Sequence, residues 1–511
     1  MSEKTFSTIA GASLLLVAFN MVGKGLGFIR EIVFANYYGL TKDFDIYLIG
    51  AVIPVVLNSI ILFIGQNFFI PSYQKISIGN KAEGKKFFTI SLILFTLFGS
   101  LLTVGIFFCS EQFVGFFIRN LIEQKTIAIK IFQLSLLTLP FNSAIAILIA
   151  FLQAEFEFKS SVISYLFPNV VIIVMVFFFI HLFGIFAIPI GTLTGTILQF
   201  GYLVYIVNHK KTFARFDKSI LVNVIKNFGG FLGFTILIEI MGQFFVLIDR
   251  YFYSSVPQGS IAALNYAFNV FVLPITIFTF AFSTVIFPKF SFHSSKDNLF
   301  KQFVKALNIN TFIALPITLI FLFYGDVLIQ LFFQRGNFQF SDTEKTFTLL
   351  KIFSLSLVFY SGYAILNKLI YSIGKLKMLA VIQVSAILLK LILNFSFVNT
   401  YAQNGLALSS AISFIFFFVS GILVVKRYFK GMIFQETILE FGLNLLNGVF
   451  SYLLVWFIFT IGKINWEYET IIKISLFVCI YILNSKVIKQ NTYNLLEENI
   501  ILLKGLIVDK K

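Results

Sequence analysis

Apolar residues fill long stretches of this chain, and short polar segments separate them. A helix needs roughly 20 apolar residues to cross the hydrocarbon core of a membrane. Runs of about that size lie near residues 8–35, 44–70, 87–109, 129–154, 160–181, 183–207, 228–252, 262–287, 308–325, 348–373, 377–399, 404–425, 441–462 and 469–485. The pattern predicts an all-α polytopic membrane protein with about 14 transmembrane helices. That number depends on a break inside two nearly continuous pairs of runs, near residues 182 and 375.

Composition supports the same fold class. The 511 residues are 58% hydrophobic and only 12% charged, which is too much apolar surface for a soluble protein to bury. The two cysteines, Cys109 and Cys479, both lie in apolar runs, so we expect them to pack rather than to form a disulfide. The three histidines are far apart in the sequence, and we expect no metal site and no cofactor.

The net charge of +16 indicates an orientation in the membrane rather than a nucleic-acid partner. The densest basic clusters fall in loops on one side: Lys81, Lys85 and Lys86; Lys210, Lys211, Arg215 and Lys218; Lys289, Lys296, Lys301 and Lys305. Basic residues in short loops favour the cytoplasmic side and its anionic lipids. We therefore expect both termini to be cytoplasmic. The first apolar run has no small-residue cleavage site after it, and we expect it to be a retained helix.

A four-residue pattern occurs twice in the chain at a fixed offset of 220 residues. The first copy has spacings of 9, 6 and 9 residues and consists of Arg30, Gly39, Asp45 and Pro54. The second copy has the same spacings and consists of Arg250, Gly259, Asn265 and Pro274. A repeat of this kind is typical of a carrier built from two related halves around a central pathway.

Six predicted spans separate the two copies, and an even number gives both copies the same orientation in the membrane. We expect two pseudo-symmetric six-helix lobes, at residues 1–210 and 211–430, and an extra helix pair with a cytoplasmic tail at residues 431–511. No phosphate-binding loop precedes a helix, so direct use of ATP is disfavoured. The short outer loops also disfavour a membrane glycan polymerase or ligase.

Three charged residues lie in the first predicted span: Lys24, Arg30 and Glu31. A Lys or Arg near mid-bilayer costs at least about 2.5–3.5 kcal/mol, and such a residue normally faces water or an anion. Lys24 and Glu31 share a helix face, whereas Arg30 projects elsewhere on a regular helix. We expect Lys24 and Arg30 to line a cavity. The alternative is that Arg30 and Glu31 extend to the outer interface.

Asp45 lies early in the second predicted span, where Lys24 or Arg30 is a possible ion-pair partner. A structural ion pair and a substrate or proton role are both open for this carboxylate. Its counterpart in the repeat, Asn265, keeps hydrogen bonding but has no charge. Several cations and few anions favour an anionic headgroup as the ligand, and a diphosphate is the chemical class that we favour.

The second half contains five more charged candidates. Glu239 has no obvious local partner and is a candidate proton or cation site. Asp249 and Arg250 end the seventh predicted span, where anchoring at the interface is the simpler role. Lys368 and Lys390 either line the cavity or mark a misplaced span boundary.

Several segments resemble the MurJ/MviN family of lipid-linked oligosaccharide flippases, in the multidrug/oligosaccharidyl-lipid/polysaccharide exporter superfamily. The similar segments are Gly25–Glu31, Asp45–Pro54, Ile248–Tyr251, Gly259–Ala267, Leu331–Phe338 and Tyr371–Leu406. Their order and spacing cover nearly the whole chain, including the two extra C-terminal helices of this branch.

The resemblance implies a V-shaped, two-lobed carrier with a cationic central cavity. Such a carrier moves undecaprenyl-diphosphate-linked sugars, for example lipid II, from the inner to the outer leaflet by alternating access. The first-span arginine pair of the family corresponds to Lys24 and Arg30, and its second-span acid corresponds to Asp45. By the same resemblance, a second-span arginine of the family falls near Asn58 and an eighth-span arginine corresponds to Asn269, so this chain lacks two family arginines.

Three other functions stay open. The missing arginines favour an O-antigen or capsule repeat-unit flippase as the closest alternative. A cation-coupled drug antiporter would need acidic residues, and Asp45 and Glu239 are the candidates. A glycan polymerase or ligase is the third. We expect a transporter rather than an enzyme, monomeric, in the bacterial inner membrane. Its partners would be a lipid-linked diphosphate saccharide and membrane lipids, without nucleic acid.

Overall fold

The computed structural model describes residues 22–118, 122–209, 212–214, 234–279, 295–429, 435–462, 469–488 and 490–494. Every regular element among these residues is a helix, which confirms the predicted all-α fold class. The chain divides into two compact units. Unit 1 consists of residues 1–263, 335–339 and 394–403, and unit 2 consists of residues 264–334, 340–393 and 404–511.

The helices of the first half of the chain follow a described helix at residues 22–38. They are α2 (Lys42–Gly50), α3 (Val52–Gly79), α4 (Lys81–Phe108), α5 (Ser110–Gly115), α6 (Ile122–Leu136), α7 (Leu139–Ala154), α8 (Phe158–Ser164), α9 (Leu166–Phe183), η1 (Gly184–Phe186) and α10 (Ala187–His209). The later helices are α12 (Phe234–Tyr251), η2 (Tyr253–Ser255), α13 (Ser260–Pro274), η3 (Ile275–Thr279), α15 (Lys296–Phe333), α16 (Phe340–Ser354), α17 (Leu357–Ser372), α18 (Leu376–Tyr428), α19 (Gln435–Gly462) and α20 (Glu469–Val487).

Nine helical stretches of the described residues are long and apolar enough to cross a membrane, or ten if the bent pair α16 and α17 forms one span. The stretches Phe158–His209 and Leu376–Tyr428 have 52 and 53 residues, whereas one crossing needs about 20. Each is therefore long enough for two crossings. The predicted runs 8–35, 228–252 and 262–287 lie partly outside the described residues, so the number of fourteen stays a prediction.

The breaks expected inside the two tight pairs of runs are present. Gly184, with a φ of 53°, separates α9 from α10, and these two helices pack along each other. Gly374, with a φ of 71°, separates α17 from α18. Positive φ suits glycine because it has no Cβ atom. Within α18, Ala402 has a φ of 47° and a ψ of −128°, which divides it into two helical segments.

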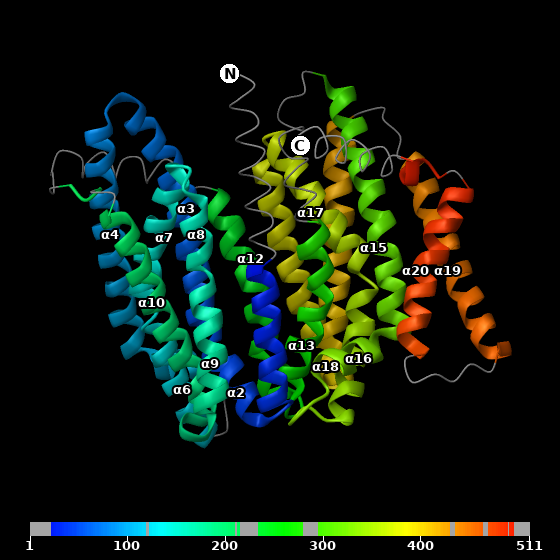
Figure 1. The fold of residues 1–511 in the computed structure, drawn as a ribbon, viewed down its shortest axis with the longest axis horizontal. Coiled ribbons are helices and arrows are strands. Elements are labelled where there is room, and N and C mark those ends of the chain that lie inside the picture. Colours follow the sequence, from blue (N-terminus) through cyan, green and yellow to red (C-terminus); the bar gives the residue numbers. More distant parts are fainter. Residues whose placement is uncertain are drawn as a thin grey trace, which may run out of the picture. The chain divides into compact units, whose positions relative to one another are not determined.

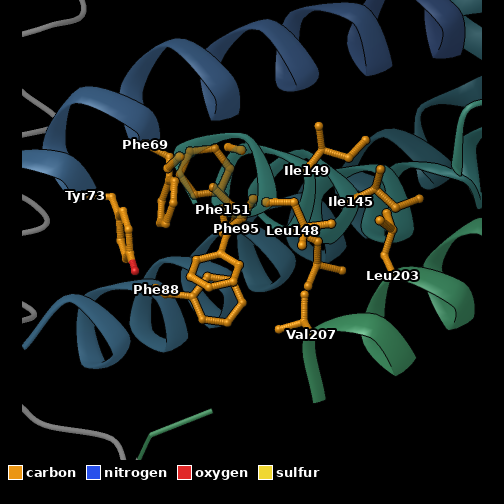
Figure 2. Packing of buried hydrophobic residues seen from close by; sticks show 14 of the residues in the cluster. Phe69, Tyr73, Phe88, Phe95, Ile145, Leu148, Ile149, Phe151, Leu203 and Val207 are labelled. Atoms are coloured by element: carbon orange, nitrogen blue, oxygen red, sulfur yellow. The ribbon is translucent and has the colours of Figure 1, made fainter. Parts of the chain in front are cut away.

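Four helices of unit 1, α3, α4, α7 and α10 (Figure 1), contribute the residues of an apolar core (Figure 2). Aromatic side chains fill it, and the ring centres of Phe88 and Phe151 lie 4.4 Å apart. Small residues let the helices approach closely, because a Cβ atom at Gly65 would lie only 2.6 Å from the Cβ of Ala146. Close packing of this kind replaces the hydrophobic driving force between helices that lipid does not supply.

In unit 2, the two C-terminal helices α19 and α20 pack on α15 through a smaller apolar cluster that includes Leu315, Val455 and Phe477. A buried polar seam also joins α19 to α20. The amide of Asn447 donates to the carbonyl of Tyr481 at 2.9 Å and to the hydroxyl of Ser485 at 2.8 Å. Such bonds hold helices together in lipid. The predicted division at residues 210 and 430 stays a prediction.

Candidate functional site

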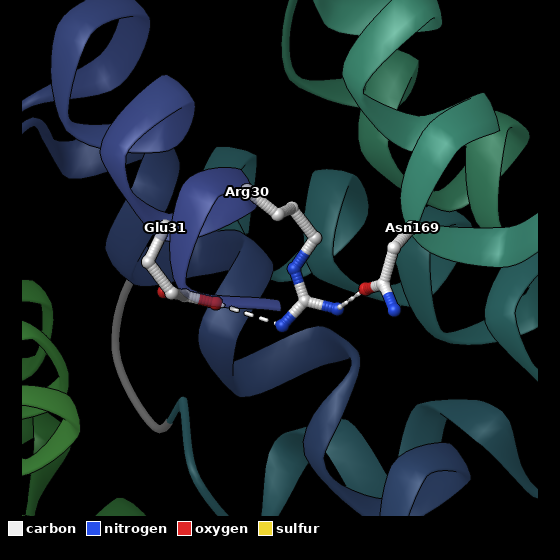
Figure 3. A network of polar contacts seen from close by, with 3 residues as sticks. All are labelled: Arg30, Glu31 and Asn169. Carbon is white, nitrogen blue, oxygen red and sulfur yellow. Dashed lines mark hydrogen bonds and ion pairs between the residues drawn. The ribbon is translucent and has the colours of Figure 1, made fainter. Parts of the chain in front are cut away.

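Arg30 lies on the first described helix and makes two polar contacts in unit 1 (Figure 3). Its Nη2 donates to Oε1 of Glu31 at 2.8 Å, and its Nη1 donates to Oδ1 of Asn169 on α9 at 3.1 Å. The Arg30 side chain is 31% exposed and the Glu31 side chain is 9% exposed. The cation is therefore half-buried and carries its own counter-ion.

Successive residues on a helix point about 100° apart, so neighbours do not normally face each other. The pair forms because the long Arg30 side chain turns toward Glu31, while Phe34 lies beneath the guanidinium with its ring centre 5.5 Å away. The Nε of Arg30 is buried and has no hydrogen-bond partner among the described residues. Arg30 is thus held in place without using all of its donors.

Asp45 is completely buried on α2, and its carboxylate binds backbone amides 214 and 217 residues away. Oδ2 accepts from the N–H of Gly259 at 2.6 Å, and Oδ1 accepts from the N–H of Ala262 at 2.7 Å. These amides lie at the start of α13, where helical N–H groups have no partner of their own and favour an anion. The structure therefore places Asp45 on a helix N-terminus rather than on Lys24 or Arg30.

The loop that contains Asn337 closes over the end of the first helix, within unit 1. The N–H of Asn337 donates to the carbonyl of Asn36 at 2.8 Å, and its side-chain amide donates to the carbonyl of Tyr37 at 2.6 Å. Gly336, with a φ of 56°, has no room for a side chain because its backbone lies against Asn36. This contact gives a structural role to the segment Leu331–Phe338, which the sequence singled out without assigning a role.

Lys24 is exposed on the same helix as Arg30. The two residues are six positions apart, which corresponds to about 9 Å along a helix axis. Three glycines flank Lys24, and a Cβ atom at Gly23, Gly25 or Gly27 would meet nothing within 4 Å. Among the described residues, this stretch of the helix therefore has no close neighbour at the three glycines.

Asn58, near which the family resemblance places an arginine, lies on α3. Its amide nitrogen donates to the hydroxyl of Thr138 at 2.8 Å, whereas its Oδ1 is buried and has no partner among the described residues. Asn58 therefore binds a neighbouring helix through its donor side and keeps an unused acceptor.

Helix α12 carries three of the predicted candidates. Glu239 accepts a hydrogen bond from Gln243, one helical turn away, at 2.9 Å. Asp249 accepts from the side-chain amide of Asn394 at 3.1 Å, and Arg250 points toward the carbonyl of Ile261 at 3.5 Å. Glu239 thus has a local partner that sequence reasoning missed.

Three further candidates lie in unit 2, and we describe them within that unit. Asn269 on α13 and Lys368 on α17 are half-buried, and Lys390 on α18 is only 1% exposed. Lys390 is thus buried within unit 2, and both roles considered for it stay predictions. The sequence did not single out Asn169, although one amide inside the otherwise apolar run 160–181 was an available signal.

Comparison with known proteins shows the family of the chain over most of its length. The family model described as "Lipid II flippase MurJ" matches residues 34–477. A protein of Borreliella burgdorferi named "Probable lipid II flippase MurJ" is 27% identical over 436 residues, which cover 82% of this chain and 84% of that protein. A protein of the same name from Thermotoga maritima is 25% identical over 477 residues, with 91% of this chain and 93% of that protein covered.

Solved structures share the fold. The structure described as "Lipid II flippase MurJ, inward closed conformation" has a TM-score of 0.81 at 23% identity and covers 94% of this chain and 99% of that chain. An inward-facing multidrug resistance transporter of the MATE family has a TM-score of 0.65 at 14% identity, with 82% of this chain and 98% of that chain covered. Both are polytopic helical membrane proteins, in agreement with the predicted fold class.

Proposed function

Because the chain belongs to the lipid II flippase MurJ family, we propose that it moves an undecaprenyl-diphosphate-linked saccharide from the inner to the outer leaflet by alternating access. Lipid II is the cargo that we favour. The protein would act in the bacterial inner membrane as a monomeric transporter rather than an enzyme, with both termini cytoplasmic.

The family match over residues 34–477 is the observation that carries this proposal. The chemistry of the first helix supports it. Arg30 is a half-buried guanidinium within an apolar segment, and guanidinium groups bind phosphate oxygens through paired hydrogen bonds. Lys24, exposed about 9 Å away along the same helix, adds a second positive charge. We propose that these two cations bind the diphosphate, with the apolar chain of the cargo left in the lipid.

One observation favours a second cargo of the same class. Asn58 and Asn269 replace two family arginines, so this chain offers fewer cations to a diphosphate-sugar headgroup. An O-antigen or capsule repeat unit, carried on the same lipid diphosphate, is therefore our second candidate.

Transport in liposomes tests the proposal. Purified protein should move a fluorescent lipid-diphosphate sugar across the bilayer, and Arg30→Glu should reduce the rate to background. Arg427→Glu is the matched control, because Arg427 is exposed at the end of α18 and its reversal should leave the rate unchanged. An Arg30→Glu protein that inserts and transports normally would refute the assignment.

Complementation distinguishes the cargoes. A cell depleted of its own lipid II flippase should survive when it expresses this chain. Survival of a capsule-flippase mutant alone would instead favour the second cargo. Equal movement of a cationic dye and of the diphosphate sugar in liposomes would favour a drug antiporter, the alternative from another class.

A further inference from the structure

The guanidinium of Arg30 is only partly used by the protein. An arginine side chain has five N–H donors. Glu31 takes one on Nη2 and Asn169 takes one on Nη1, while the buried Nε has no partner among the described residues. The cation is therefore electrically compensated, although its hydrogen-bonding capacity is not filled.

The ion pair between Arg30 and Glu31 also has fewer hydrogen bonds than a pair of this type can form. An arginine and a carboxylate often bind through two parallel hydrogen bonds, which adds strength and direction. Here one oxygen of Glu31 accepts from Nη2, and the neighbouring Nε is left without a partner. A ligand with several anionic oxygens could accept from the second N–H of Nη1 and of Nη2 and replace this single bond.

We propose that Glu31 is a displaceable counter-ion that makes Arg30 selective for diphosphate lipids over singly charged phospholipids, and that Asn169 is the residue that positions the guanidinium. This inference rests on the proposed function, because it concerns how the same site chooses its cargo. The argument concerns charge and hydrogen bonds on one arginine, all within unit 1.

Selectivity is a physical necessity for such a site. A bacterial membrane contains anionic phospholipids in large excess over any lipid-linked sugar, and an uncompensated arginine would bind their phosphodiester groups. Glu31 lies 2.8 Å from the guanidinium and is 9% exposed, so its charge opposes any incoming anion with little screening by water. A phosphodiester has one charge and gains too little from Arg30 to offset this repulsion. A diphosphate has at least two charges and more acceptor oxygens, so it can take the guanidinium from Glu31.

Asn169 keeps the guanidinium of Arg30 in position while its anionic partner changes from Glu31 to the ligand. Its Oδ1 holds Nη1 at 3.1 Å from a different helix, α9, and it carries no charge. When the Nη2 bond to Glu31 breaks, this second contact keeps the guanidinium in place for the ligand. A neutral acceptor is required here, because a second carboxylate would compensate Arg30 twice and exclude the diphosphate too.

Binding measurements on the full-length protein in nanodiscs test the inference. The probe is undecaprenyl diphosphate, and undecaprenol is the uncharged control lipid. In zwitterionic nanodiscs, Glu31→Gln should bind the diphosphate about tenfold more tightly than the wild type, the scale of one charge-assisted hydrogen bond. Addition of phosphatidylglycerol should then weaken binding strongly in Glu31→Gln and little in the wild type. Equal affinity and equal sensitivity to phosphatidylglycerol in both proteins would overturn the inference.

A second variant keeps the test valid if Glu31→Gln folds poorly. Asn169→Asp has nearly the same shape but adds a carboxylate against Nη1, and it should weaken diphosphate binding about tenfold. Glu111→Gln is the matched control, because Glu111 forms an ion pair of the same length, 2.8 Å, with Lys125 on the surface of unit 1. Unchanged affinity in Asn169→Asp would also overturn the inference.

The outcomes separate this inference from the proposed function. If the wild type binds undecaprenyl diphosphate no better than undecaprenol, the proposed function itself fails. If the wild type prefers the diphosphate and the variants at Glu31 and Asn169 match it in affinity and selectivity, only the counter-ion inference fails.

Discussion

Asp45→Asn should destabilise unit 1, although it replaces one oxygen by a nitrogen of nearly equal size. Both carboxylate oxygens of Asp45 accept backbone N–H groups, at 2.6 Å from Gly259 and 2.7 Å from Ala262. An amide has one acceptor oxygen, so one N–H loses its acceptor and faces a second donor. The other N–H keeps its hydrogen bond, but the acceptor is now the oxygen of a neutral amide instead of a carboxylate.

The magnitude follows from these two contacts. A hydrogen bond to a charged group contributes about 1.5–3 kcal/mol, and a buried donor without a partner costs about 1–3 kcal/mol. The two effects overlap, and we expect a loss of about 2–4 kcal/mol in the free energy of unfolding. With an unfolding entropy of about 2.1 cal/mol/K per residue, this corresponds to about 3–7 °C in melting temperature for a unit of this size.

Thermal unfolding in detergent measures the effect, and Asp43→Asn is the matched control. Asp43 lies on the same helix and undergoes the same change of charge, but its side chain is exposed, so its melting temperature should stay close to that of the wild type. Hydrogen exchange should also quicken at the amides of Gly259 and Ala262 in Asp45→Asn alone. If both variants melt together and these amides remain protected, Asp45 does not cap α13 in the way described.

Two further predictions concern other contacts of unit 1. Gly259→Ala should lower the melting temperature more than Gly184→Ala. Both positions have a positive φ, which costs about 1–2 kcal/mol for a residue with a side chain. Only at Gly259 would the new Cβ also lie 2.5 Å from a backbone oxygen, that of Leu40. An equal fall in melting temperature in both variants would show that the contact between the new Cβ and Leu40 is relieved at no cost in stability. Lys125→Met should lower stability at neutral pH but not in acid, because the hydrogen bond and charge of Lys125 lower the pKa of Glu111 below its ordinary value. The ion pair therefore stabilises the folded state at a pH above the ordinary pKa of Glu111, and this stabilisation is lost as the pH falls through the lowered pKa. A difference in melting temperature between Lys125→Met and the wild type that persists in acid would contradict this prediction.

In each copy of the repeated pattern, the arginine lies on one helix and the Asp or Asn lies on a following α-helix. Gly39 and Gly259 both adopt positive φ, 55° and 79°, at corresponding places in the two copies. That the backbone of Gly259 lies against Leu40 could not be predicted, because spacing along a sequence reports only local geometry. The contact between Asn337 and Asn36 was beyond prediction for the same reason, since 301 positions separate these residues.

The charged residues show a second limit of sequence reasoning. The sequence identifies Asp45 as an acid in an apolar run, and it suggests the side chains of Lys24 and Arg30 as partners. Its partners are backbone N–H groups, which every residue except proline has and which therefore leave no trace in the sequence. Conversely, Arg30 and Glu31 were expected to point apart on a regular helix, and the length of the arginine side chain brings them together.

Asp45 and Arg30 differ in how many of their hydrogen-bonding groups the fold already uses. Both oxygens of Asp45 are occupied by the fold, and the residue is completely buried, so a ligand could reach this carboxylate only by unseating the start of α13. Arg30 is half-buried and keeps at least the Nε donor unused among the described residues. This difference supports our proposal that Arg30, rather than Asp45, contacts the cargo, and charge and position in the sequence could not make this distinction.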